Sequence, residues 1–551
     1  MRSSDGKPHV QPQPRADDAL NSLNERPWLD HKLQSSCQAN MAADNTTANP
    51  LDERFETLVQ ETLDYWHVPG ISIAVVDGDN TWAKAGGYGI AAFPAEPVTP
   101  STLFYAGSTT KAFTAALMAT IVEDDDNFPQ VHWDTPISQL IRDDFVLHDE
   151  HATEHTTIED ALSHRSGLPR HDQAYGNRLT RDEAVRTIVR QLRHLPLTAP
   201  PRTKLQYCNL MYVVVSHVIE TLAGGEWLGD TLARTIWHPL DMKSTYFSLN
   251  DAKSSPHHLA RGYYHTPSDS DSDTDSNHYH EVPWMSLDEI SGAGSIISNV
   301  LDYAKWARAL LHQTEPLSPA VYKAIFEPRT LLPSEAPFTG PRAYALGWYT
   351  GVYQGVQFFE HTGGMNAFGA EVILFPSLKY AVVMLANTAG TSNYAQKALA
   401  FRLVDEKLGV PVERRFDWNA KNMAHIEEER KKALDAIHKA PAHVIPHSLE
   451  LGEYVGTYVH PGYQTVEIYL DQSKTILRAD RDRTTWPEYL TFKHVNGEHF
   501  LAISEHVGDL GAFFPDVYAA EFRIGEKGKP CALGVAWEKT MKEKIWFTRL
   551  D

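Results

Sequence analysis

The sequence predicts an α+β fold: an antiparallel sheet flanked by helices, with a helical subdomain, followed by a small all-β barrel or sandwich. Two observations predict the first part. A helical pattern leads into a strand hairpin over residues 50–89, and three successive strand patterns over residues 358–387 return to the same sheet. The third observation is a change after residue 449, where aromatic and β-branched runs alternate with Gly, Asn, Asp and Pro.

We expect the chain to divide into four parts. Residues 1–49 are polar, contain proline and lack periodicity, which is typical of a disordered arm. Residues 50–412 carry the predicted α+β domain and residues 413–446 a charged helix with a linker. Residues 447–551 carry the all-β domain.

The elements of the α+β domain follow from their start and stop residues. A helix over residues 50–66 ends before Gly70, and Gly70–Gly78 reads as a buried strand that turns at Asp-Gly, with Trp82–Gly89 as its hairpin partner. A second helix begins at Gly107–Ser108 and continues through an Ala-, Leu- and Met-rich stretch. Further helices are expected at residues 210–222, 299–311 and 417–439, and the segment 157–169 is expected to hold a short helix with Thr157 as its N-cap, ended by Gly and Pro.

One acidic stretch, residues 268–276, alternates Ser or Thr with Asp. A calcium loop is an alternative, but the stretch lacks the glycine and the closing glutamate of an EF-hand. We expect a disordered surface loop.

Charge and cysteine content exclude several classes of function. The 551 residues include 71 acidic and 50 basic side chains, so the net charge of −21 repels nucleic acid and anionic membranes. Cys37, Cys208 and Cys531 lie far apart and form neither a disulfide framework nor a metal-ligand spacing. Because no apolar segment lies near residue 1, we expect a cytoplasmic protein. From the charge and the cysteine spacing we expect no metal, no cofactor, and no nucleic-acid or membrane partner. The oligomeric state cannot be read.

The start of the helix at Ser108 carries the first chemical signal. Ser108 and Lys111 are three residues apart and share a helix face, where a lysine with a depressed pKa is able to deprotonate a serine hydroxyl. Free N–H groups at a helix start also favour negative charge. A Ser-x-x-Lys match also arises by chance roughly once or twice in a chain of this length.

A second signal is Tyr207-Cys208-Asn209. A phenol beside a cationic lysine either acts as a phenolate or relays a proton, and an amide both donates and accepts. A tyrosine near a helix start more often serves packing.

The third signal is His361-Thr362-Gly363-Gly364. Consecutive glycines weaken a strand, and one reason for them is a ligand that approaches the backbone. The N–H groups of Gly364 and Ser108 would then form an oxyanion hole. A plain β-bulge is the alternative.

In chain order, Ser-x-x-Lys, Tyr-x-Asn and His-Thr-Gly resemble the three signatures of the serine penicillin-recognising enzymes. The resemblance covers about residues 51–408 and points to the peptidase S12-like branch of class C β-lactamases, D-Ala-D-Ala carboxypeptidases, D-aminopeptidases and esterases. The region from residue 449 is similar to the lipocalin-like domain of some members. Supporting stretches are Val68–Gly70, Gly87–Gly89, Thr102–Phe104, Leu162–Pro169, Gly292–Gly294 and Leu346–Trp348.

The resemblance implies an acyl-enzyme mechanism. Ser108 attacks a carbonyl, Lys111 and Tyr207 share the proton handling, and Asn209 orients them. The amides of Ser108 and Gly364 hold the oxyanion.

Two positions refine this expectation. His361 replaces a lysine that many members carry, so we do not expect a fixed cation for a substrate carboxylate at this position, and Thr362 is a candidate for hydrogen bonding the substrate. Cys208 fills a variable position and is expected to pack rather than react.

We therefore expect a serine hydrolase that acts on a small amide or ester through an acyl-Ser108 intermediate. The alternative is an acyltransferase that passes the acyl group to an alcohol or amine. A third hypothesis is a non-catalytic scaffold, against which the presence of Ser108, Lys111, Tyr207 and Asn209 argues.

Overall fold

The computed structural model describes residues 49–84, 86–176, 180–266, 278–388, 390–439, 441, 443–506 and 515–550. The predicted N-terminal arm, including Cys37, and the acidic stretch 268–276 lie outside the described residues.

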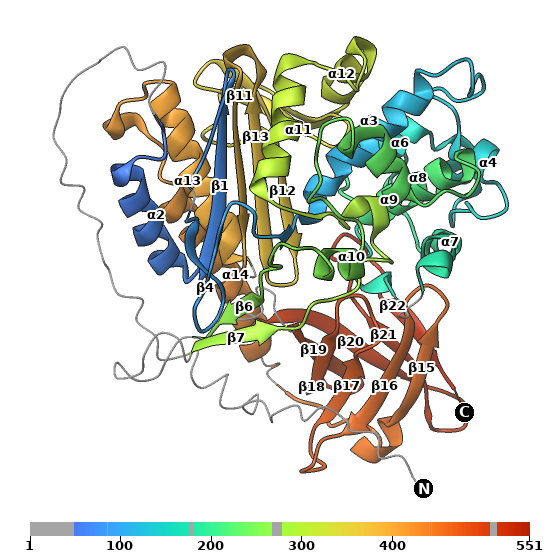
Figure 1. Cartoon of the computed structure of the whole chain (residues 1–551). Helices are drawn as coiled ribbons and strands as arrows, with labels where there is room; N and C mark the ends of the chain where they lie inside the picture. The colour runs from blue at the N-terminus through green and yellow to red at the C-terminus, as the bar shows by residue number, and fades with distance from the viewer. Residues whose placement is uncertain are drawn as a thin grey trace, which may run out of the picture. The chain divides into compact units, whose positions relative to one another are not determined.

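A ten-stranded sheet, counted over the described residues, forms the centre of the first domain (Figure 1). Its strand pairs are antiparallel and follow the order β4-β3-β1-β14-β13-β12-β11-β10-β9, with β2 paired to β1. The strands are β1 (Gly70–Asp77), β2 (Asn80–Ala83), β3 (Tyr88–Ala92), β4 (Glu96–Pro97), β9 (Thr330–Leu332), β10 (Arg342–Tyr344), β11 (Tyr349–Tyr353), β12 (Val356–Met365), β13 (Phe368–Phe375) and β14 (Tyr380–Ala386).

The hairpin after β1 differs in detail from the prediction. The single expected partner strand over residues 82–89 is split into β2 and β3, and both pair with β1 at different positions. Gly87 lies between them with a φ of +56° and abuts the backbone of Val98, where a Cβ would come within 2.3 Å of the carbonyl oxygen. The left-handed backbone at this glycine ends regular pairing.

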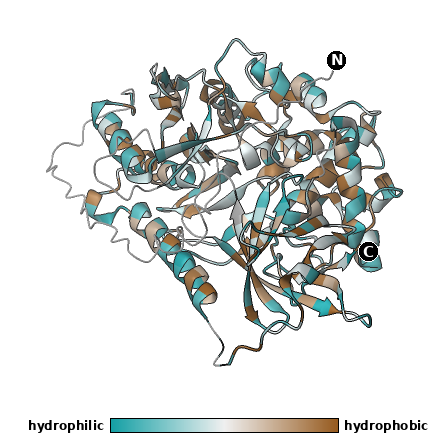
Figure 2. Ribbon diagram, turned by 90° about the horizontal axis from the view of Figure 1, so that it is seen from below, coloured by the Kyte–Doolittle hydropathy of each residue, from teal (hydrophilic) through white to brown (hydrophobic). Residues whose placement is uncertain are grey.

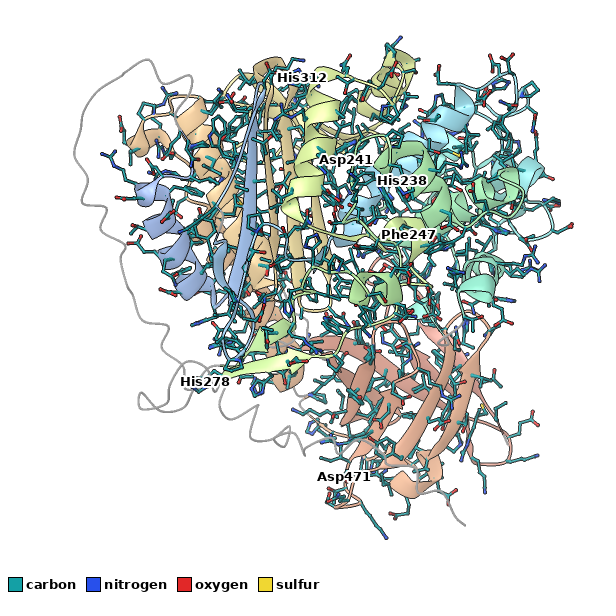
Figure 3. The ribbon with its side chains drawn as sticks, in the orientation of Figure 1. His238, Asp241, Phe247, His278, His312 and Asp471 are labelled. Atoms are coloured by element: carbon teal, nitrogen blue, oxygen red, sulfur yellow. The ribbon has the colours of Figure 1, made fainter. Side chains whose placement is uncertain are left out.

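Helices cover both faces of the sheet. On one face lie α2 (Glu53–Trp66), α13 (Thr391–Lys407) and α14 (Trp418–His438), which bury one apolar cluster with β1, β13 and β14. Asp52 begins α2 by accepting from the backbone N–H groups of Arg54 and Phe55. On the other face, α11 (Val300–His312) contacts β1 and β14. His312, labelled in Figure 3, stands at the end of α11. Its Nε2 lies 3.1 Å from the carbonyl oxygen of Gly78.

A helical subdomain packs beyond α11 (Figure 1). Its central helix, α3 (Thr110–Val122), is buried on almost every side, as expected for a helix that is apolar all round. The other helices are α4 (Ile137–Leu140), α5 (Glu150–His155), α6 (Ile158–Leu162), α7 (Arg181–Gln191), α8 (Asn209–Leu222), α9 (Leu228–Leu232), α10 (Leu249–Lys253) and α12 (Pro319–Phe326). Two short ladders join these segments, β5 (Phe104–Tyr105) with β8 (Ile297–Ser298) and β6 (Gly262–His265) with β7 (Tyr279–Val282).

The C-terminal part is a closed barrel, counted as eight strands over the described residues. Each strand pairs with the next, and β22 closes the ring on β15, which is the up-and-down order of lipocalin-type barrels. The strands are β15 (Gly456–His460), β16 (Gln464–Leu470), β17 (Leu477–Arg481), β18 (Glu488–Asn496), β19 (His499–His506), β20 (Asp516–Ile524), β21 (Pro530–Val535) and β22 (Ile545–Arg549).

Alternation along the barrel strands fills its interior. In β16 and β20 the buried side chains occupy every second position, and Figure 2 shows hydrophobic and hydrophilic residues alternating along the strands. Aromatic side chains such as Tyr458, Phe500 and Phe522 pack against one another inside. The predicted fold class is thus confirmed, and the second part is a barrel rather than a sandwich.

Candidate active site

Ser108 lies in a short 3₁₀ turn, Gly107–Thr109, between β5 and α3. The α-helix begins at Thr110, two residues later than the sequence predicts, because the chain enters it through this 3₁₀ turn, and Gly107 at the start of the turn has a φ of +51°. The hydroxyls of Thr109 and Thr110 donate to carbonyl oxygens three residues earlier, at 2.9 and 2.7 Å, and hold the turn. Ser108 is partly exposed and faces a pocket.

Lys111 is fully buried beneath Ser108. Its Nζ donates to Ser108 Oγ at 3.0 Å, to Asn209 Oδ1 at 2.7 Å and to the carbonyl oxygen of Ala293 at 2.7 Å. Burial lowers the pKa of Lys111 well below its usual value, and the positive charge of Arg170 lowers it further. The lowered pKa favours the neutral amine, which would donate its two N–H groups to Asn209 and Ala293 and accept from the Ser108 hydroxyl.

The carbonyl of Ala293 reaches Lys111 because of a glycine. A Cβ on Gly292 would lie 2.6 Å from the hydroxyl oxygens of Ser216 and Thr114, so this turn packs directly against α3 and α8. The turn belongs to Gly292–Gly294, one of the stretches that support the resemblance.

The side chain of Tyr207 interacts with Ser108, and the centre of its ring lies 4.9 Å from Lys111 Nζ. Burial raises the pKa of the phenol well above its usual value, and the nearby phenol of Tyr349 raises it further. Of the two roles considered for this phenol, the neutral proton relay fits its environment better than a standing phenolate. Cys208, next along, is buried, and burial raises the pKa of its thiol to about 12, as expected for a packing residue.

His361 is a buried, neutral residue of β12. Its Nδ1–H donates to the carbonyl oxygen of Thr362 at 2.7 Å, and Nε2 accepts from the Tyr344 hydroxyl at 3.1 Å. Burial, and after it the charge of Lys111, lowers the pKa of His361 to about 3. His361 therefore supplies no positive charge at neutral pH, while the exposed Thr362 lines the pocket.

The backbone of β12 approaches the Ser108 turn closely. A Cβ on Gly363 would lie 2.0 Å from the Ala106 carbonyl oxygen, and a Cβ on Gly107 would lie 2.9 Å from the Gly364 nitrogen. The consecutive glycines thus serve close approach within a regular ladder, in which Gly363 pairs with Ala370 and Gly364 with Gly369. The Gly364 N–H lies beside the serine turn, where an oxyanion would form.

Asn393, on α13, fixes the same peptide from its other side. Its Nδ2 donates to the Gly363 carbonyl oxygen at 2.9 Å and to the Ala370 carbonyl oxygen at 3.3 Å. Because a trans peptide directs its C=O and N–H to opposite sides, holding the Gly363 oxygen orients the Gly364 N–H. No motif in the sequence indicated Asn393.

Two charged residues beside the predicted cluster were also not predicted. The guanidinium carbon of Arg170 lies 5.0 Å from the centre of the Tyr207 ring, and Arg170 Nε lies 2.5 Å from Asp172 Oδ2. Asp172 Oδ1 accepts from Asn209 Nδ2 at 3.3 Å. Both residues closely follow the stretch Leu162–Pro169, which supports the resemblance and could have directed attention to them.

The cluster opens into a pocket of about 880 Å³. From the first domain its lining includes Ser108, Arg170, Asp172, Tyr207, Asn209, Tyr349, His361, Thr362, Gly364 and Asn393. From the barrel it includes Tyr463, Trp486, Pro487, Asp516, Tyr518, Trp537, Glu538, Lys539 and Thr540.

These barrel residues share one end of the barrel. They lie in or beside the connections β15–β16, β17–β18, β19–β20 and β21–β22, which meet at the same end of an up-and-down barrel. Asp471, in the β16–β17 turn, marks the opposite end (Figure 3). The structure thus brings together all eight predicted site residues, and adds a wall that the sequence did not indicate.

Two further findings concern the described residues as a whole. None of their helices has the length and hydropathy needed to cross a membrane. Within the same ranges, no group of three or more His, Cys, Asp or Glu side chains is arranged to hold a metal ion.

Comparison with known families gives two matches. The Beta-lactamase family matches residues 55–406, and a domain of unknown function, DUF3471, matches residues 440–549.

Two curated fungal proteins are similar over most of their length. Unguisins hydrolase ungD' of Aspergillus campestris is 48% identical over 511 residues, which cover 91% of this chain and 93% of that protein. Unguisins hydrolase ungD of Aspergillus violaceofuscus is 42% identical over 536 residues, covering 92% of each.

A solved structure shares the fold across both domains. The octameric penicillin-binding protein homologue from Pyrococcus abyssi superposes with a TM-score of 0.55 at 20% identity, covering 90% of this chain and 99% of that one. At this identity the likeness concerns the fold alone.

Proposed function

The chain belongs to the β-lactamase family of serine hydrolases, and from this premise we propose that it cleaves an amide or ester bond through an acyl-Ser108 intermediate. One observation carries the proposal. Buried Lys111, with its lowered pKa, lies 3.0 Å from Ser108 Oγ, and Tyr207, whose side chain interacts with the same hydroxyl, has its ring centre 4.9 Å from the lysine nitrogen. A base within hydrogen-bond reach of the hydroxyl is what turns serine into a nucleophile.

The residues divide the acylation step between them. Ser108 Oγ attacks the substrate carbonyl carbon, neutral Lys111 accepts the hydroxyl proton, and the carbonyl oxygen takes up negative charge. The N–H groups of Ser108 and Gly364 stabilise this oxyanion. When the C–N or C–O bond breaks, the proton passes through the Tyr207 phenol to the leaving amine or alcohol, and Ser108 is left acylated.

Deacylation repeats the sequence with water. Neutral Lys111 accepts a proton from the attacking water, relayed by the Tyr207 phenol, the acyl C–O bond to Ser108 breaks, and the serine oxygen takes a proton back from Lys111. Asn209 holds Lys111 throughout by accepting from its Nζ. In the acyltransferase alternative, an alcohol or amine replaces this water.

Water as the acceptor is supported by the relatives' names. Both fungal relatives, which cover more than nine-tenths of this chain, are named hydrolases of unguisins. We extend this to a substrate class: an unguisin or a compound of that kind, cut at one amide or ester bond.

The pocket supports a substrate larger than a single amino acid derivative. Its volume of about 880 Å³ lies near the upper end of the range of roughly 300–1,000 Å³ for small-molecule sites. His361 is neutral and Arg170 in the wall is already paired with Asp172, while Lys204 and Lys539 also carry positive charge at the pocket. Within the proposal we keep a cytoplasmic location, which the free thiols of Cys208 and Cys531 favour.

The test combines covalent labelling with turnover. Intact-mass spectrometry after incubation with a fluorophosphonate should give one adduct on the wild type and none on Ser108→Ala, whose turnover should fall by about a thousandfold or more. Absence of an adduct on the folded wild type would favour the scaffold hypothesis.

A substrate panel then separates hydrolysis from transfer. Unguisins and short acyl esters are offered with and without alcohols and amines, and products are identified by mass. Hydrolysed product should dominate in every case. Acyl transfer that exceeds hydrolysis would replace our proposal with the acyltransferase.

A further inference from the structure

The segment Arg170–Gly176, here called the pocket loop, belongs to the first domain but is held by the barrel. Arg481 of β17 donates through Nη2 to the Gln173 carbonyl oxygen at 2.8 Å and through Nη1 to Gln173 Oε1 at 3.2 Å. The backbone N–H of Thr485 donates to the Tyr175 carbonyl oxygen at 3.4 Å. A Cβ on Gly176 would lie 2.4 Å from the Thr485 nitrogen, so loop and barrel backbones touch.

His171 is held directly by two barrel residues. Its backbone N–H donates to Glu538 Oε2 at 3.1 Å, and its ring Nδ1 accepts from the Tyr463 hydroxyl at 2.6 Å. Ring Nε2–H donates to the Pro196 carbonyl oxygen at 2.9 Å. The residue is buried in a left-handed conformation with a φ of +46°, which a non-glycine residue keeps only when its surroundings impose it.

The same loop reaches the reacting groups. Asp172, next to His171, accepts from Asn209 Nδ2, and Asn209 Oδ1 accepts from Lys111 Nζ. An amide can be turned either way about its axis, and Asp172 selects the orientation that presents oxygen to the lysine. Lys111 in turn donates to Ser108.

We propose that the barrel is a positioning element of the catalytic site: Tyr463 and Glu538 hold His171 so that Asp172 fixes Asn209, and Asn209 fixes Lys111 beneath Ser108. This rests on the proposed function and deepens it, because it gives the domain of unknown function a part in the proton-handling machinery. The barrel residues act through the loop and need not touch the substrate.

The buried ion pair behind the loop agrees with this role. Arg481 and Glu488 are fully buried, with Nη1 and Oε2 3.3 Å apart, and Glu488 also accepts from Ser504 at 2.7 Å. Arg481 thereby enters the interface as a rigid group, fixed from the barrel side before it reaches Gln173.

The experiment uses the full chain and a probe too small to span the pocket, 4-nitrophenyl acetate. Tyr463→Phe removes one hydroxyl and Glu538→Gln removes one charge, and the two are made singly and together. Turnover is expressed per site labelled by a fluorophosphonate at completion, which corrects for any misfolded fraction. We expect kcat for the acetate ester to fall at least tenfold in the double variant, with little change in KM.

Tyr469→Phe is the matched control. Its hydroxyl donates to Asp480 on the outside of the barrel, so the same atom is removed away from the loop, and kcat should be unchanged. If the double variant is unstable, the single Tyr463→Phe carries the test, with an expected fall of about threefold or more in kcat per labelled site.

If kcat for the acetate ester stays at the wild-type value in these variants, the proposal is overturned. This holds even if kcat for a bulky substrate falls, because the barrel would then act only as a wall of the pocket. Failure of the proposed function is separate: it would appear as turnover that survives in Ser108→Ala.

Discussion

Replacing Arg170 with glutamine should move the acidic limb of the pH–rate profile to higher pH. Lys111 must be neutral to accept the serine proton, so activity rises as pH passes through the pKa of Lys111. Arg170 repels the ammonium form and lowers that pKa. Asp172 keeps its hydrogen bond from Asn209, and without Arg170 to balance it, its negative charge favours the ammonium form more strongly. Both effects raise the pKa of Lys111.

The size of the shift follows from the geometry. Lys111 Nζ and Arg170 Cζ lie 4.9 and 5.0 Å from the centre of the same Tyr207 ring, so they are at most about 10 Å apart. Two charges at that distance interact by about 1.7 kcal/mol at an effective dielectric constant near 20, and by about 0.4 kcal/mol in water. The Arg170 side chain is 54% exposed, which screens it toward the lower figure. We expect a shift of roughly 0.3–1.2 pH units.

Other groups around Lys111 set the baseline and stay in place. They are Asp172, Tyr207, Cys208, Tyr212, His164 and His361. The two histidines have lowered pKa values and stay neutral in the measured range.

The assay is kcat/KM for a short acyl ester between pH 5 and 10. Arg170→Lys keeps the charge and is the control, so its limb should coincide with that of the wild type. A limb that moves to lower pH in Arg170→Gln, or that moves equally in both variants, would refute the electrostatic argument.

The remaining predictions concern the oxyanion strand and the sheet behind it. Asn393→Ala should lower kcat by about 10- to 100-fold with little effect on KM, because the Gly364 N–H loses its orientation. Asn366 also lines the pocket, and Asn366→Ala is the kinetic control. Gly363→Ala should unfold the site or abolish labelling of Ser108, because the new Cβ would lie 2.0 Å from a backbone oxygen. Gly364→Ala should fold normally, since the nearest atom to its Cβ is 3.9 Å away. Circular dichroism and serine labelling compare the two variants, and equal behaviour would contradict the close approach of β12 to the serine turn. Burial raises the pKa of the Glu371 carboxyl from about 4.5 to about 8, so its contribution to stability is complete below pH 4.5 and is lost as pH rises to 8. Between pH 5 and 8 the melting temperature of Glu371→Gln should therefore fall less than that of the wild type. Parallel curves of melting temperature against pH would contradict this prediction.

Most of the fold was predictable because its signals are local. The strands β1, β12, β13 and β14 appear as apolar runs bounded by turns, and Thr157 marks a helix start that the structure confirms through its side-chain hydrogen bond. The first helix was placed less well: it begins at Glu53 behind the cap of Asp52, three residues after the predicted start. The turn at Gly107 was less predictable. Its left-handed backbone is set by the approach of Gly364, which lies more than 250 residues away in the chain.

The candidate site was predictable where three short motifs could be recognised together. Ser108, Lys111, Tyr207 and Asn209 meet as the motifs require. Residues whose roles arise from pairing across the molecule carry no such signal, and Asn393 is one of them. His171 and Tyr463 are 292 positions apart, and nothing local to either indicates their contact.

The closure of the barrel has a consequence for how the protein matures during synthesis. Strand β22 joins β15 to β21, so the ring cannot close until residue 549 has been made. The nucleophile and its base are translated some hundreds of residues earlier, which at ~5–20 residues per second leaves an interval on the order of tens of seconds. During that time the pocket loop beside Ser108 and Lys111 is not yet tethered, so the ribosome-bound chain should have reduced activity until the barrel closes.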